Sequence, residues 1–145
     1  DELDKELNAL KANGAIHTKE KIIASMAEKY VLLIDESKFY DTLPLKDSVT
    51  LEVIPQSRNY VQAQIEKLGG KAVMRKSGAK ADFVISDNGN IMDTDFSNVA
   101  TFAGKPEELH KKLKQLTGVV ETALFIDMVA FALCVCGDEV KVIEK

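Results

Sequence analysis

Four charged side chains in the first 38 residues could together carry acid–base chemistry: Asp1, Lys11, Glu20 and Lys38. Two carboxylates and two ammoniums that converge near strand ends could move a proton and bind an anionic substrate. The segment from Lys11 to Ala15 is a turn of small residues before a predicted helix, and such a turn can aim backbone N–H groups at an anion. Taken singly, none of these features is specific.

Two of these features also have a purely structural interpretation. Glu20 falls in the first turn of the predicted helix, where the helix dipole favours its ionised form by about 0.3–1 kcal/mol, so it could be an ordinary surface glutamate. The segment from Asp35 to Lys38 follows a predicted strand, and ligands bind at the carboxyl ends of strands in open α/β sheets. A solvated turn would give the same pattern. At the level of single residues both interpretations stay open.

The sequence contains no metal-binding motif. The two histidines, His17 and His110, stand alone in their segments. Cys134 and Cys136 lie two residues apart in an apolar run, so on a strand they point to the same face, a geometry that disfavours a disulfide. We therefore expect buried free thiols and no metal ion.

Composition excludes several classes of protein. Apolar residues make up 46% of the 145 residues and charged residues 29%, which is typical of a globular chain. The net charge is −4 and there are only two arginines, so we expect no nucleic-acid partner. The longest apolar run covers nine residues, 128–136, and about twenty are needed to span a membrane. The chain opens with charged residues instead of a secretory signal, which predicts a cytoplasmic location.

A helix and a strand must position the first charged groups. Apolar residues at helical spacing predict a helix over 18–29, with Thr18 as its N-cap. The helix leads into the continuous apolar run 30–34, which is typical of a strand covered on both faces in a parallel sheet. Later, the runs 129–135 and 140–143 flank Gly137-Asp138 and predict a hairpin, or a strand that returns to this first lobe.

The middle of the chain predicts a compact lobe of its own. Asn88-Gly89 between apolar runs indicates a hairpin, and Pro106 and Gly118 bound a helix. The predicted elements are strands at 49–53, 72–75, 83–86, 91–95 and 119–125, and helices after Ser57 and after Pro106. Their order, β-α-β-β-α-β with one extra short strand, is typical of the ferredoxin-like arrangement.

Several motifs in order resemble the A-type ribose-5-phosphate isomerases. That family has Asp-Gly-Ala-Asp-Glu, then Lys-Gly-Gly-Gly-Ala, then Arg-Glu-Lys-Ile, and residues 1–24 are similar to this series from its second aspartate onward. Residues 30–38 resemble the family's strand ending in Asp-x-Ser-Lys, and residues 52–58 resemble its Val-Glu-Val-Ile-Pro-x-x-Arg. Residues 68–70, 87–90 and 118–122 also have counterparts, so the resemblance covers essentially the whole chain.

The resemblance implies interconversion of D-ribose 5-phosphate and D-ribulose 5-phosphate through a cis-enediolate, with neither metal nor organic cofactor. Glu20 matches the family's proton acceptor, and Lys11 with the backbone N–H groups of residues 12–14 matches its donors to the substrate oxygen. Asp1 matches an aspartate that contacts the sugar hydroxyls and assists ring opening. Lys38 matches a substrate-binding lysine.

The chain departs from the family pattern in two places. The family's Lys-Gly-Gly-Gly is Lys11-Ala12-Asn13-Gly14 here, so two positions gain a Cβ atom, and alanine fits a left-handed backbone less well than asparagine does. About a third of a family chain, including its Thr-Gly-Ser-Thr phosphate loop, has no counterpart. We therefore expect these 145 residues alone not to isomerise ribose 5-phosphate at a useful rate.

The resemblance also implies an architecture. We expect an α/β fold in which residues 1–47 and 126–145 form part of a Rossmann-like catalytic lobe. Residues 48–125 are expected to form the ferredoxin-like α+β lobe and to mediate assembly into a homodimer or homotetramer. The alternative is a non-catalytic sensor module of the same fold that binds a sugar phosphate, although a sensor would not need both Glu20 and Lys11.

Overall fold

Apolar residues of the ferredoxin-like lobe form one core between a sheet and two helices. The computed structural model describes residues 2–11, 14–77, 83–86 and 88–145. Val49, Leu51 and Val53 alternate along β5 (Val49–Val53), and all three are fully buried. The core residues of α2 (Arg58–Lys67) and α3 (Pro106–Lys114) pack in the same cluster, and these are Val61, Ile65, Leu109 and Leu113.

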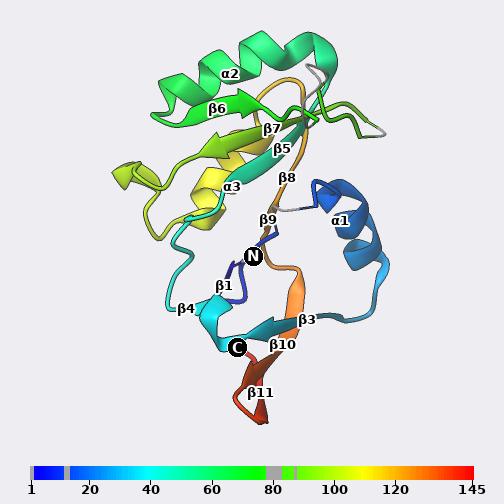
Figure 1. The fold of residues 1–145 in the computed structure, drawn as a ribbon, viewed down its shortest axis with the longest axis vertical. Coiled ribbons are helices and arrows are strands. Elements are labelled where there is room, and N and C mark those ends of the chain that lie inside the picture. Colours follow the sequence, from blue (N-terminus) through cyan, green and yellow to red (C-terminus); the bar gives the residue numbers. More distant parts are fainter. Residues whose placement is uncertain (1, 12–13, 78–82, 87) are drawn as a thin grey trace.

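The sheet of this lobe has the predicted topology. Its strand order is β6-β7-β5-β8, with β6 at Lys71–Met74, β7 at Asn90–Asp95 and β8 at Val119–Thr122. All neighbouring strands are antiparallel, and the chain order is β-α-β-β-α-β, which confirms the ferredoxin-like prediction. The strand expected at 83–86 is reduced to two isolated bridges, Lys76 to Phe83 and Ile85 to Asn90. Figure 1 shows this lobe in the upper part of the molecule.

The rest of the chain forms two further sheets. The first has the order β4-β1-β2-β9 and consists of Phe39–Tyr40, Glu2–Asp4, Ala9–Leu10 and Leu124–Phe125. The second has the order β11-β10-β3, with β3 at Tyr30–Asp35, β10 at Val129–Cys136 and β11 at Glu139–Ile143. β10 is parallel to β3 and antiparallel to β11, so the hairpin and the return to the first lobe are both confirmed. Short 3-10 helices complete the chain, η1 (Glu36–Lys38), η2 (Pro55–Ser57) and η3 (Ala100–Phe102).

Helix α1 (His17–Met26) begins and packs differently from the prediction. Its N-cap is Ile16, and Thr18 lies inside the helix, where its hydroxyl donates a hydrogen bond to the Glu52 carboxylate. The apolar residues that predicted the helix point outward, and Met26 is 81% exposed. The buried residues of α1 are instead His17, Lys21 and Ala24. Spacing predicted the helix, but it did not predict which face would be buried.

Strand β3 is covered on one face only. Leu32 is buried, whereas its neighbour Leu33 is 78% exposed, so the expectation of cover on both faces is wrong for this chain. Between the lobes, β9 pairs with β2, and Phe125 packs with Leu3 of the first lobe. Contacts with the first lobe therefore include β9, which lies inside the range 48–125 predicted for the other lobe.

Candidate active site

Lys11 and Glu20 come together in the structure. Lys11 follows β2, and its backbone N–H donates to the carbonyl oxygen of Ala123 at 3.0 Å. Glu20 lies in the first turn of α1, where its N–H donates to the carbonyl oxygen of Ile16 at 3.1 Å. The Lys11 Nζ atom is 3.6 Å from Glu20 Oε1, and the two side chains are 19% and 31% exposed. Two of the residues predicted for the site thus form one partly sheltered ion pair.

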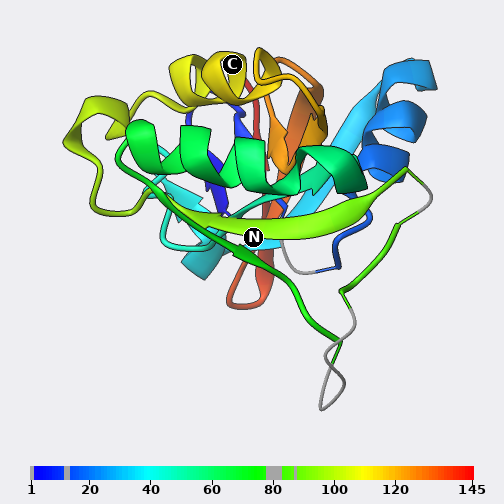
Figure 2. The same ribbon diagram turned by 90° about the horizontal axis from the view of Figure 1, so that it is seen from above.

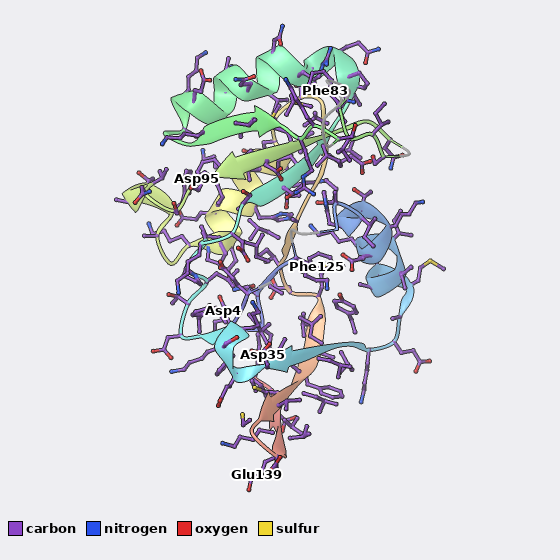
Figure 3. All side chains as sticks on the ribbon, in the orientation of Figure 1. Asp4, Asp35, Phe83, Asp95, Phe125 and Glu139 are labelled. Carbon is purple, nitrogen blue, oxygen red and sulfur yellow. The ribbon has the colours of Figure 1, made fainter. Side chains whose placement is uncertain are left out.

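An aromatic side chain lies behind this pair. The Phe125 ring is fully buried, and its centroid is 6.0 Å from Lys11 Nζ and 5.2 Å from Lys21 Nζ. Tyr30 stacks on the ring with centroids 5.9 Å apart. Burial and the charge of Glu20 both raise the pKa of Tyr30. Figure 3 shows Phe125 near the middle of the molecule, on the side of α1. Both aromatic residues were missed from sequence, because an aromatic residue in an apolar strand looks like any core residue.

The pair can carry out proton transfer next to an oxyanion. A carboxylate can accept a proton from carbon, and an ammonium ion can stabilise the negative charge that then develops on oxygen. An apolar wall such as Phe125 excludes water on one side and lowers the local dielectric, which strengthens both interactions.

The loop before α1 contains a left-handed residue. Ala15 has φ 54°, a region that a non-glycine residue enters at a cost on the order of 1 kcal/mol or more. By contrast, a Cβ atom on Gly14 would meet Ile16 Cγ1 at 3.5 Å, an ordinary contact, so this glycine is not sterically required here. Asp1, Ala12 and Asn13 lie outside the described residues, and their predicted roles stay predictions.

Lys38 lies apart from the pair. It ends η1, which follows the carboxyl end of β3, whereas α1 precedes the start of that strand. Figures 1 and 2 both show α1 and η1 near opposite ends of β3. The hydrogen bond from Ser37 lowers the pKa of Asp35, and the charge of Lys38 acts in the same direction. The structure therefore does not bring Lys38 beside Glu20, and its substrate-binding role stays a prediction.

A cleft of about 230 Å³ lies between the start of α1 and the sheet of the ferredoxin-like lobe. On the side of the first lobe, the cleft is lined by Gly14, Ala15 and Ile16, which directly precede α1. Its floor includes the Glu52 carboxylate, which is 1% exposed. The lining side chains that carry polar groups are Thr18, Lys19, Glu52, Ser86 and Asn88.

The cysteines are free, and the histidines have lowered pKa values. Cys134 and Cys136 are free thiols with their Sγ atoms 3.6 Å apart; Cys134 is buried as predicted, whereas Cys136 is only partly buried. Burial lowers the pKa of both histidines, that of His110 to about 4. Within the described ranges, no group of three or more His, Cys, Asp and Glu side chains is arranged to hold a metal ion. In the same part of the chain, no helix is both long and apolar enough to cross a membrane.

Comparisons with known proteins identify the family of the chain. The family model described as ribose 5-phosphate isomerase A (phosphoriboisomerase A) matches residues 1–139. The chain is 40% identical over 127 residues to the ribose-5-phosphate isomerase A of Trichodesmium erythraeum, covering 87% of this chain and 52% of that protein. It is 39% identical over 145 residues to the ribose-5-phosphate isomerase of Meyerozyma guilliermondii, covering 96% and 56%.

Solved structures give the same result. The ribose 5-phosphate isomerase A of Methanocaldococcus jannaschii superimposes with a TM-score of 0.87 and 35% identity, covering 100% of this chain and 63% of that one. A D-ribose-5-phosphate isomerase in complex with phospho-erythronic acid superimposes with a TM-score of 0.88 and 34% identity. This match covers 100% of this chain and 62% of that one. The chain spans between 52% and 63% of the length of these four proteins. It belongs to the ribose 5-phosphate isomerase A family.

Proposed function

We propose that the chain forms part of an aldose–ketose isomerase that interconverts D-ribose 5-phosphate and D-ribulose 5-phosphate. The observation that carries the proposal is the Lys11–Glu20 pair, with 3.6 Å between Nζ and Oε1, held against Phe125. A solved relative binds phospho-erythronic acid, which is a phosphorylated sugar acid, and this supports an anionic sugar derivative as the substrate.

In the proposed reaction, Glu20 takes the proton from C2 of the open-chain aldose. The electrons of that bond move into a C1–C2 double bond, and the former carbonyl oxygen at C1 takes the negative charge of the enediolate. Lys11 stabilises this charge, together with the backbone N–H groups of residues 12–14. The hydroxyl proton of the oxygen on C2 moves to the negatively charged oxygen on C1, Glu20 returns the carbon-bound proton to C1, and the oxygen on C2 becomes the carbonyl. One carboxylate that reaches both carbons is sufficient.

Asp1 and Lys38 complete the proposed site. Asp1 would contact the sugar hydroxyls and assist ring opening, and Lys38 would bind the substrate as a point charge. Because the chain spans little more than half the length of its relatives, we propose that the activity requires a protein of their full length.

The protein is further proposed to work in the cytoplasm as a homodimer or homotetramer. Apolar side chains on the outside of the ferredoxin-like lobe, Ile54, Tyr60 and Val73, support its role in assembly. Light scattering of the full-length protein would test the assembly, and a monomer at micromolar concentration would contradict it.

The test of the proposed function is Glu20→Gln in a protein of the relatives' full length. This change keeps the size of the side chain and removes its basicity, so kcat should fall by about a hundredfold or more with a smaller change in KM. Glu28→Gln is the matched control, because Glu28 is exposed just beyond the same helix. More than about a third of wild-type turnover in Glu20→Gln, or an effect on KM alone, would contradict the assignment.

A further inference from the structure

We infer that two glutamates of the ferredoxin-like lobe, Glu52 and Glu121, are positioning residues for proton transfer, because they hold α1 in the orientation that places Glu20 beside Lys11. The inference rests on the proposed function of Glu20. It gives the ferredoxin-like lobe a direct part in the geometry of the active site, in addition to assembly.

The start of α1 is not fixed by its own sequence. Its N-cap residue is Ile16, whose side chain cannot accept a hydrogen bond from the first turn, and the preceding Ala15 is left-handed. A helix start without a polar cap leaves its first N–H groups without their usual side-chain partners. The orientation of α1 must therefore come from contacts with the rest of the protein.

The first contact is made by Glu52 of β5. Its carboxylate is 1% exposed and accepts a hydrogen bond from the Thr18 hydroxyl through Oε2. Its other oxygen accepts a hydrogen bond from the backbone N–H of Asn88 at 3.3 Å. A buried carboxylate is costly unless hydrogen-bonded, and loss of the Thr18 hydroxyl would leave Oε2 with a long hydrogen bond from Asn88 Nδ2, at 3.5 Å.

The second contact is made by Glu121 of β8. Its Oε1 atom is 2.9 Å from Lys21 Nζ, and its Oε2 atom is 3.1 Å from Lys114 Nζ. Burial alone would raise the pKa of Glu121, but the Lys21 ammonium lowers it overall, so the carboxylate stays charged. The backbone carbonyl oxygen of Glu121 also lies 3.3 Å from His17 Nε2, which must carry the hydrogen in that contact.

These two glutamates are neighbours in the sheet. Glu52 and Glu121 are cross-strand partners of β5 and β8, on the face opposite the core positions Leu51 and Val53. Like charges directly opposite each other destabilise a sheet unless each finds a partner. Helix α1 contributes a hydroxyl to one carboxylate and an ammonium to the other, so docking satisfies both glutamates and orients the helix.

The helical geometry links this docking to Glu20. Successive residues of an α-helix are about 100° apart, so His17 and Lys21 form one stripe, with Thr18 on one side of it and Glu20 on the other. The stripe faces Glu121, Thr18 reaches Glu52, and Glu20 reaches Lys11. A small rotation of α1 about its axis would therefore move Glu20 away from Lys11, and a misplacement of about 1 Å can cost up to a hundredfold in rate.

The test compares three variants in a protein of the relatives' full length. Thr18→Val keeps the shape but removes the hydroxyl, and we expect kcat to fall about tenfold with little change in KM. Thr18→Ser keeps the hydroxyl and should retain most of kcat. Thr50→Val is the control: Thr50 lies two residues before Glu52 on the same strand, and its hydroxyl donates to Asp93 at 2.9 Å instead of to Glu52. Wild-type kcat in Thr18→Val, or an equal loss in Thr50→Val, would overturn the inference.

A structural readout separates this inference from the proposed function. Hydrogen exchange of the α1 amides in the 145-residue chain should be faster in Thr18→Val than in wild type, and unchanged in Thr50→Val. Equal exchange in Thr18→Val and wild type would overturn the role of Glu52 whatever the enzyme does. An inactive wild type would overturn the proposed function instead, while the exchange result would still decide whether Glu52 holds α1.

Discussion

The core of the ferredoxin-like lobe and the sheet formed by β11, β10 and β3 bury their apolar residues to very different extents. In the first, Leu51, Ile65 and Leu109 are fully buried between the sheet and two helices. In the second, Leu33 on β3 and Val140 on β11 are largely exposed. The helices of the ferredoxin-like lobe thus cover its own sheet, whereas the sheet of β11, β10 and β3 leaves apolar side chains exposed in this chain.

Helix α1 combines features of both regions, because one face is buried and its larger apolar residues are exposed. It buries polar residues, His17 and Lys21, against the ferredoxin-like lobe, and it leaves Ile23 and Met26 exposed. The ferredoxin-like lobe therefore acts as the fixed support for α1, which carries Glu20, the residue proposed to transfer the proton. Stability should therefore depend more on the ferredoxin-like core than on the sheet of β11, β10 and β3.

The largest expected effect contrasts two leucines. Leu109→Ala removes a fully buried side chain from the ferredoxin-like core and should lower the free energy of unfolding by about 2–5 kcal/mol. Leu33→Ala changes an exposed side chain, so its free energy of unfolding should stay within about 0.5 kcal/mol of the wild-type value. Urea unfolding of the 145-residue chain measures both. Equal losses would show that the open sheet is as tightly packed as the ferredoxin-like core.

A smaller contrast is expected between two glycines. Gly118 has φ 95°, and a Cβ atom there would lie 2.2 Å from Ser57 Cβ, so Gly118→Ala adds a clash to backbone strain. Gly137 in the β10–β11 hairpin has φ 61° with nothing within 4 Å, so Gly137→Ala meets strain alone, about 1 kcal/mol. In thermal unfolding, the melting temperature of Gly118→Ala should be well below that of Gly137→Ala. The reverse order of melting temperatures would mean that the β10–β11 hairpin contributes more to stability than the packing of Gly118 against Ser57.

A third effect concerns pH. Burial, aided by the charge of Lys21, lowers the pKa of His110 from 6.5 to about 4, and His110 Nδ1 lies 2.8 Å from the Thr122 hydroxyl. Below pH 6.5 the unfolded chain therefore binds a proton that the folded chain refuses until about pH 4, so stability falls as the pH drops through this window. His110→Gln should make the decline in melting temperature shallower between these two pH values. Parallel declines in the two proteins would contradict a buried neutral histidine.

The fold could be predicted largely because its patterns are local. The alternation of apolar residues in 49–53 and the helical spacing of Leu109 and Leu113 predicted the ferredoxin-like lobe. These patterns were sufficient because the helices of the lobe cover its own sheet. The same reasoning was wrong for Leu33 and Met26, because an apolar residue in a regular pattern says nothing about which neighbour covers it.

The candidate site could be predicted only in part. Glu20 and Lys11 were found by resemblance, and the structure brings them together. Glu52 could not be recognised, because it occupies the polar side of an alternating strand and looks solvent-exposed until α1 docks on that side. Phe125 was missed for a similar reason, since only the tertiary fold brings it beside Lys11.

The central claim is that Glu20 transfers a substrate proton beside Lys11, and isomerisation in D₂O tests it most directly. A proton held by a carboxylate exchanges with solvent, so ribulose 5-phosphate formed by a protein of the relatives' full length should contain deuterium at C1. In Glu20→Gln both turnover and incorporation should fall by about a hundredfold or more. Product formed without deuterium, as a direct hydride shift would give, or undiminished incorporation in Glu20→Gln, would contradict the account.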